Sequence, residues 1–211
     1  MKLYTLLFIL LISSSLFAQY DSCGIQKSQY SDLYAVIPQD ISCIARHSDK
    51  DISLFYTFAS WCIPCRAHFP AIIDIVKKYD LDFYIVIPER ENDSIMVKQT
   101  TNYLNKLLGK DYKGLIVSDS LYSLKNRYKK QKKFVLIKTY GVKEREKYAN
   151  FITQITPPQF ENIDDMGKVI LVNKMGEVFL ITTYKDAEGD KTNEKTFVKI
   201  RKYIETERNK E

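Results

Sequence analysis

The part of the sequence that decides the fold reads Ile52-Ser53-Leu54-Phe55-Tyr56-Thr57-Phe58-Ala59-Ser60-Trp61-Cys62-Ile63-Pro64-Cys65. Its first half, Ile52 to Phe58, is apolar, β-branched or aromatic, which is typical of a buried strand. After Cys65, apolar residues recur at helical spacing, namely Phe69, Ile72, Ile73 and Val76. The two cysteines therefore lie where a strand turns into a helix.

Outward from this stretch, strands and helices alternate. The runs 83–87 and 115–117 are apolar and predict two more buried strands. Between them, Asp93 is placed to cap a helix that Gly109 closes. This alternation is typical of an α/β sheet with parallel neighbours.

The carboxy-terminal part predicts a hairpin and a closing helix. The strands cover 169–172 and 177–181, and the helix carries Phe197, Ile200 and Ile204 on its apolar face. Upstream, residues 125–133 hold six basic residues and no acid, and 134–137 are apolar. We interpret about 123–140 as a basic surface insertion containing a short strand. Only one aromatic residue interleaves the basic run, which argues against nucleic acid as a partner.

The composition indicates a globular protein. The 211 residues are 45% hydrophobic and 27% charged, which excludes wholesale disorder and collagen-like repeats. This length suits one domain with embellishments. The net charge of +6 is a mild bias and gives no nucleic-acid signature.

The amino terminus has the pattern of a secretory signal peptide. Residues 1–18 combine one lysine, a short apolar run and Ala18 before Gln19. The alternative is an uncleaved membrane anchor, although a spanning helix needs about 20 apolar residues. We expect a signal peptide at 1–18, an N-terminal extension at 19–49 with a short helix opened by Pro38, and the main domain at 50–211. The protein is then periplasmic or secreted, without stable membrane insertion after cleavage.

The paired cysteines can carry redox chemistry. One helical turn brings the side chains of Cys62 and Cys65 within disulfide reach. Free N–H groups at the helix start stabilise a thiolate on the first cysteine. Cys62 is then the attacking nucleophile, and Cys65 resolves the mixed disulfide. Pro64 restrains the turn, and Trp61 covers the flank of the site.

The pair has two other possible interpretations, a zinc site and an inert structural disulfide. A zinc site needs two further ligands, and neither His47 nor the remaining cysteines form a second paired motif, so no metal is expected. An inert structural disulfide is not expected either, because a bond across two residues constrains little of the unfolded chain and so adds little stability.

These residues resemble the thioredoxin-like superfamily, and more closely its exported bacterial thiol-disulfide oxidoreductases. The match runs from Phe55 to Pro70, a proline that in the family kinks the long helix five residues after the second cysteine. It covers about 50–89 well and 168–204 more loosely. The resemblance implies an α/β three-layer sandwich with a mixed central sheet and an insertion before the terminal hairpin. It also implies protein disulfides or dithiols as substrates and no cofactor.

The sequence departs from the family at three positions. Tyr56 stands where some thioredoxins carry a buried acid. His68 stands where exported relatives often carry an acid; it is a candidate proton shuttle, because i, i+3 spacing places it on the same face as Cys65 and histidine titrates near neutral pH. The alternative is that His68 is an ordinary hydrogen-bonded or exposed helix residue with no part in the chemistry. The third departure is Lys168, which precedes the hairpin where the family has a cis-proline.

The two prolines at 157 and 158 lie upstream of this position. A cis bond between Thr156 and Pro157 is the preferred candidate, which adds both residues to Trp61, Ile63 and Pro64 as the expected substrate-binding set. The alternative is that Pro157 and Pro158 simply end a helix.

Cys23 and Cys43 form the second cysteine pair. In an oxidising compartment they are expected to form a structural disulfide that ties the leader to the domain. Either could instead serve as an extra exchange partner.

The sequence therefore predicts an exported thiol-disulfide oxidoreductase. The absence of positive charge at Ile63 and Pro64 favours a reductant over a strong oxidant. The alternative is a redox-inactive protein-binding module that keeps only the fold.

Overall fold

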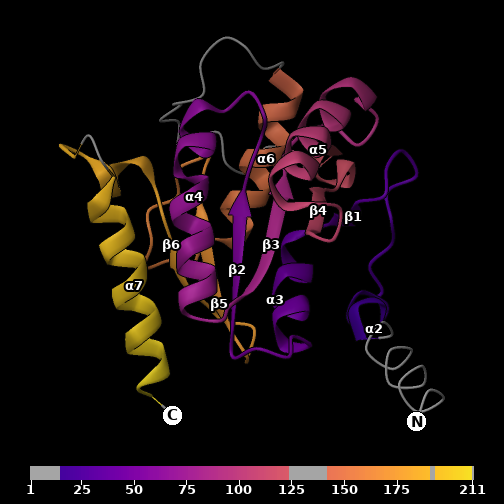
Figure 1. Cartoon of the computed structure of the whole chain (residues 1–211). Coiled ribbons are helices and arrows are strands. Elements are labelled where there is room, and N and C mark those ends of the chain that lie inside the picture. Colours follow the sequence, from indigo (N-terminus) through magenta and orange to yellow (C-terminus); the bar gives the residue numbers. More distant parts are fainter. Residues whose placement is uncertain (1–14, 124–141, 191–192, 211) are drawn as a thin grey trace.

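The computed structural model describes residues 15–123, 142–190 and 193–210, which form a mixed α/β structure (Figure 1). The predicted basic insertion lies almost wholly outside these residues, as does most of the predicted signal peptide. Within the described part of the chain, none of the helices combines the length and apolar character that crossing a membrane requires.

Six strands form one mixed sheet in the order β1-β4-β3-β2-β5-β6. The strands are β1 (Tyr34–Val36), β2 (Ile52–Thr57), β3 (Asp82–Ile87), β4 (Lys113–Val117), β5 (Val169–Asn173) and β6 (Val178–Ile181). The first four are parallel to one another, and β5 and β6 add an antiparallel hairpin beside β2. The predicted mixed sheet is confirmed.

Helices cover both faces of this sheet. They are α2 (Ser15–Ser22), α3 (Pro38–Arg46), α4 (Ile63–Lys78), α5 (Ser94–Leu108), α6 (Val142–Ile155) and α7 (Glu194–Arg208). Residues of α4, α5 and α7 share one buried cluster with the sheet, and residues of α3 and α6 share the other. The arrangement is three layers, helices on sheet on helices (Figure 1).

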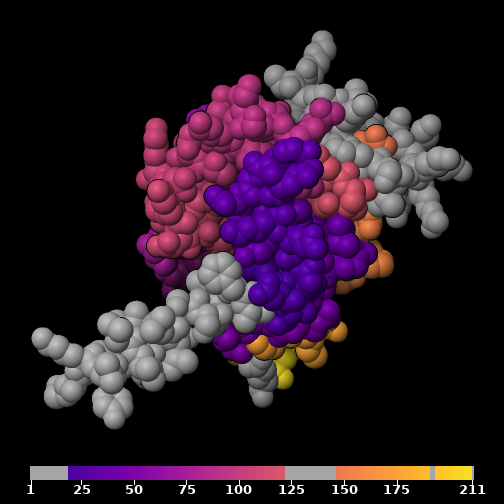
Figure 2. All heavy atoms as spheres, turned by 90° about the vertical axis from the view of Figure 1, so that its right-hand side faces the viewer, coloured from indigo at the N-terminus to yellow at the C-terminus, as the bar shows by residue number. Residues whose placement is uncertain are grey.

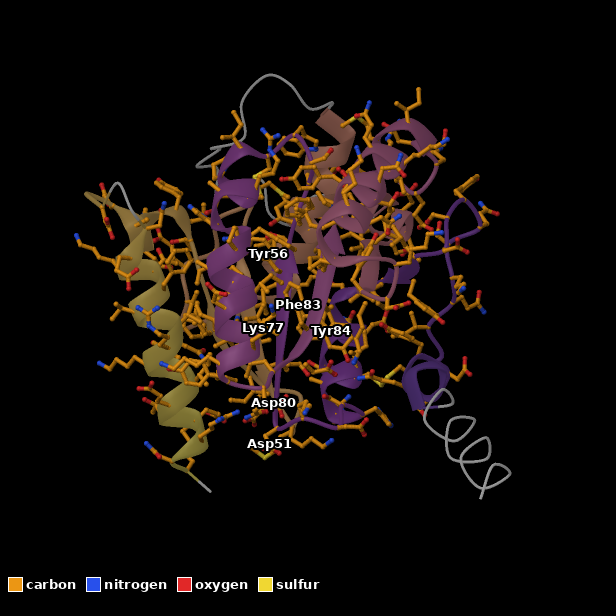
Figure 3. All side chains as sticks on the ribbon, in the orientation of Figure 1. Asp51, Tyr56, Lys77, Asp80, Phe83 and Tyr84 are labelled. Atoms are coloured by element: carbon orange, nitrogen blue, oxygen red, sulfur yellow. A yellow bond between two sulfur atoms is a disulfide. The ribbon has the colours of Figure 1, made fainter. Side chains whose placement is uncertain are left out.

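β2 is the central strand that leads to the cysteine pair. All six of its residues are buried, because helices pack on both sides. Tyr56 belongs to the cluster on the α4 side of the sheet and Tyr84 to the cluster on the other side; both are labelled in Figure 3. Phe55 also faces the Tyr84 side and stacks on Tyr84 with ring centroids 4.7 Å apart. Burial on both faces explains why its sequence is continuously apolar rather than alternating.

The segment from Gln19 to Val36 is part of the core, although only an extension was expected there. β1, which was not predicted, pairs with β4 at the edge of the sheet. Gln19 is buried, donates to Ile44 O at 2.6 Å and accepts from the Tyr84 hydroxyl at 2.9 Å. Figure 2 shows this segment, in indigo, lying across one side of the molecule.

Candidate functional site

The cysteine pair lies at the start of α4, as the sequence predicts. Cys62 is the N-cap residue, and its Sγ accepts a hydrogen bond from the Cys65 backbone amide at 3.2 Å. The two sulfurs form a disulfide with Cα atoms 5.2 Å apart. An N-terminal amide therefore points at the first sulfur, the arrangement that stabilises negative charge there.

The two sulfurs differ in their access to solvent. Cys62 is 5% exposed and Cys65 is 0% exposed. The side chains of Ile63, which is 69% exposed, and Pro64 lie on the surface beside them. Both cysteine residues are thus buried, Cys65 completely, and the apolar side chains of Ile63 and Pro64 form the exposed surface beside them.

Tyr56 supports the second cysteine from the sheet. Its hydroxyl donates to the Cys65 carbonyl oxygen at 3.0 Å, and its ring is fully buried between β2 and α4. Burial raises the pKa of Tyr56 far above its usual value, so the phenol stays neutral. Tyr56 therefore cannot act as the proton acceptor that a buried acid would provide at this position.

The loop before β5 lies against Cys65. A Cβ atom added at Gly167, whose φ is +80°, would be 3.4 Å from Cys65 Sγ and 3.6 Å from the Tyr56 hydroxyl. Lys168 follows and exchanges two hydrogen bonds with Thr57, donating to its hydroxyl at 2.8 Å and accepting from its amide at 3.0 Å. The buried ammonium of Lys168 pairs with Asp165 and donates to Thr182 O at 2.9 Å, which anchors the loop.

The expectation of a cis bond at Thr156–Pro157 is wrong. The described residues contain no cis peptide bond. Thr156 instead closes α6, because its hydroxyl donates to Ile152 O at 2.6 Å, and Pro157 follows where the helix has ended. Two consecutive prolines cannot continue a helix, so this pair is a helix stop. The loop at Gly167 and Lys168 occupies the place beside Cys65 that was assigned to Pro157.

His68 lies one turn beyond Cys65 in α4. Its half-buried ring packs edge-on against Phe197 of α7, with ring centroids 5.8 Å apart. Burial lowers the pKa of His68 below its usual value, which favours the neutral imidazole. Among the described residues, no hydrogen bond joins the ring to either sulfur.

A buried acid that sequence reasoning missed lies next to Trp61. Glu89 follows β3 and is 1% exposed. Thr100 Oγ1 donates to Glu89 Oε1 at 2.9 Å and accepts from the Ser60 amide at 3.1 Å. Glu89 is thereby connected through Thr100 to Ser60, which lies two residues before Cys62.

The environment of Glu89 changes its acidity. Burial raises the pKa of Glu89 from 4.5 to about 7, although hydrogen bonds from Thr100 and Trp61 and the charge of Lys147 act in the opposite direction. Lys147 also holds the backbone, donating to Glu89 O at 2.6 Å. The sequence did contain a signal, since an acid directly after a buried parallel strand lies at the same sheet edge as the cysteines.

The second cysteine pair is also bonded. Cys23 and Cys43 form a disulfide with Cα atoms 5.9 Å apart, which joins the N-terminal segment to α3. His47 lies beside it, with Nδ1 3.6 Å from each sulfur, a proximity that was not predicted. α3 precedes the amino end of β2 and Cys62 follows its carboxyl end, so the two disulfides lie at opposite ends of the central strand.

Comparisons with protein-family models, with curated proteins and with solved structures find no match for this chain.

Proposed function

We propose that this protein is a thioredoxin-like thiol-disulfide oxidoreductase whose Cys62 exchanges disulfides with protein substrates. The observation that carries the proposal is the N-cap position of Cys62. Its sulfur receives the Cys65 amide at 3.2 Å, and Cys65 lies fully buried one turn further on. A stabilised outer sulfur with a protected inner one suits a nucleophile and a resolving thiol.

The proposed reaction begins with the reduced pair. The Cys62 thiolate attacks one sulfur of a substrate disulfide, and the other substrate sulfur leaves as a thiolate. Cys65 then loses its proton and attacks Cys62 Sγ, which releases the second substrate sulfur and forms the Cys62–Cys65 disulfide. Two electrons pass to the substrate, and the dithiol carries them without a cofactor.

The second attack needs a proton acceptor near α4. We propose His68 for this role, because its lowered pKa keeps the imidazole neutral and able to accept a proton. Glu89 is a positioning residue in this proposal. Its carboxylate holds Thr100, which accepts from the Ser60 amide, so a change in the charge of Glu89 near pH 7 would act on the backbone that leads to Cys62.

The proposal rests on the family resemblance as well as on the site. Pro70 lies inside α4, and the hairpin of β5 and β6 is followed by α7, which agrees with the implied order. We propose that substrate backbone docks at Gly167, which lies against Cys65 in the loop before β5. The rim of Ile63 and Pro64 provides apolar contact to a protein substrate.

The direction and the compartment are also proposals. Because Ile63 and Pro64 add no positive charge near Cys62, we favour reduction of substrates over oxidation. Two disulfides agree with a periplasmic or secreted location, where such bonds persist.

The reduction of insulin by dithiothreitol tests the proposed function. We expect the protein to accelerate it, Cys62→Ser to abolish the effect, and Cys65→Ser to accumulate a mixed disulfide with insulin. The matched control is the double variant Cys23→Ser/Cys43→Ser, which should keep the activity. Full activity of a folded Cys62→Ser variant would contradict the mechanism.

One observation favours a second candidate function, a redox-inactive protein-binding module. Cys62 is only 5% exposed, whereas Ile63 beside it is 69% exposed and offers a docking contact. Binding without turnover would give a folded wild-type protein that leaves the rate of insulin reduction unchanged.

A further inference from the structure

Three side chains with metal-binding atoms meet at the second disulfide. Cys43 lies in α3, and His47 is its C-cap residue four positions later, which is one helical turn. Cys23 reaches them from the N-terminal segment. The ligand atoms of the three residues all lie within 4.8 Å of one another, with the cysteines partly buried and His47 exposed.

The spacing of these atoms matches a tetrahedral zinc site. With Zn–S of about 2.3 Å and Zn–N of about 2.0–2.1 Å, tetrahedral geometry separates a sulfur and a nitrogen ligand by about 3.6 Å. His47 Nδ1 lies 3.6 Å from Cys23 Sγ and 3.6 Å from Cys43 Sγ. Both nitrogen–sulfur edges of the tetrahedron are therefore present in the oxidised protein.

We propose that reduction of the Cys23–Cys43 disulfide converts this cluster into a Zn²⁺ site formed by two thiolates and the imidazole of His47. The remaining change is between the sulfurs, which would move from bonded contact to about 3.8 Å, the edge between two zinc-bound thiolates. Because His47 is exposed, the fourth position faces solvent and takes a water molecule.

The conversion of the disulfide into a zinc site takes two steps. A protein or small-molecule dithiol supplies two electrons and two protons, which convert the disulfide into two thiols while the dithiol becomes a disulfide. Zn²⁺ then replaces the two thiol protons, which are released.

His47 must give up one contact for this purpose. Its Nδ1 lies 3.0 Å from the Cys43 carbonyl oxygen, to which it can donate a hydrogen bond. Metal binding needs the lone pair of Nδ1, so the imidazole must carry its proton on Nε2. On metal binding the imidazole therefore exchanges its hydrogen bond to the Cys43 carbonyl oxygen for a bond from Nδ1 to the metal.

The site is independent of the proposed oxidoreductase function. Since the reduced Cys62–Cys65 pair could itself bind zinc, the experiment uses the full chain with Cys62→Ser and Cys65→Ser. This variant is reduced with a phosphine, freed of reductant, and titrated with Zn²⁺ against a chromogenic chelator. We expect one Zn²⁺ per chain after reduction and none before it.

The two histidines of the chain provide a matched pair of further variants. In the same background, His47→Gln should lower the affinity for Zn²⁺ by more than about tenfold, because losing a ligand costs more than losing a residue that only contacts a ligand. His68→Gln should leave the affinity unchanged. Co²⁺ in place of Zn²⁺ should give thiolate charge-transfer and tetrahedral absorption bands. Circular dichroism checks that each reduced variant is folded. Absence of stoichiometric binding, equal affinity in His47→Gln, or equal binding by the denatured chain would overturn the proposal.

Discussion

Cys62 and Cys65 belong to the same helical turn but have different surroundings. Cys62 receives an amide hydrogen bond and has some access to solvent, whereas Cys65 lies under the Tyr56 hydroxyl and the Gly167 loop. The sequence could predict the order of the two sulfurs along the helix. It could not predict what covers the inner one, because that loop is about 100 residues away along the chain.

This difference predicts the order of alkylation. In the reduced Cys23→Ser/Cys43→Ser variant, iodoacetamide should modify Cys62 more than about tenfold faster than Cys65, since the reagent attacks accessible thiolates. Mass spectrometry of the digested protein measures both rates. In denaturant the two rates should become similar. Preferential modification of Cys65 in the native protein would contradict the assigned roles.

Glu89 predicts a pH dependence of stability. Its pKa is about 7 in the folded protein against 4.5 for the ordinary group, so the fold binds a proton that the unfolded chain has released. The stability contributed by this carboxyl is thus highest below pH 4.5 and falls as the pH rises to about 7. Relative to Glu89→Gln, the wild type should lose roughly 3 kcal/mol or less across this window.

Urea unfolding of both proteins at several pH values measures the difference. Glu188→Gln, which removes an exposed carboxylate instead of a buried one, provides the control for the loss of one negative charge. A pH-independent difference between the wild type and Glu89→Gln would contradict the prediction.

At the scale of elements, the buried strands and the hairpin were predictable, but the edge strand and the N-terminal contacts were not. β2 and β3 consist mainly of apolar and aromatic residues because both of their faces are covered, which leaves a strong sequence pattern. β1 has only three residues, too few to show any period. Its place is fixed by pairing with β4, a tertiary interaction that propensity does not encode.

The loop before β5 gives a prediction for one element. Gly167→Ala forces a side chain into a positive φ and towards Cys65 Sγ, so we expect a loss of about 1–2 kcal/mol in the free energy of unfolding. Gly189, with φ +76°, is the comparison, because a Cβ at either glycine makes only ordinary van der Waals contacts and both positions share the left-handed backbone. Chemical denaturation should therefore show a similar loss for Gly189→Ala. No loss in Gly167→Ala would contradict the prediction.

At the scale of the whole molecule, the Cys23–Cys43 disulfide fastens the N-terminal segment. The bond closes a loop with a sequence separation of 20, for which chain entropy gives about 3 kcal/mol. Gln19 and Tyr20 add buried contacts to the same segment, Tyr20 by stacking on Tyr34 with ring centroids 3.9 Å apart. The sequence predicts only an N-terminal extension for these residues, because their partners lie in α3, β3 and the unpredicted strand β1.

The double variant Cys23→Ser/Cys43→Ser should therefore unfold at lower denaturant concentration, by about 3 kcal/mol in free energy. Urea unfolding followed by circular dichroism measures this loss. The Cys62–Cys65 bond should remain intact, as thiol counting would verify. An unchanged midpoint of unfolding would mean that the bond does not restrain the denatured chain.

The placement of the two disulfides at opposite ends of β2 has a consequence for oxidative maturation. Four cysteines can join in three ways, yet once this six-residue strand has formed, about 20 Å of rigid backbone separates the pairs. A sulfur of one pair then cannot reach the other. Scrambled isomers can arise only before the sheet assembles, so an isomerase would have to act on nascent or unfolded chains.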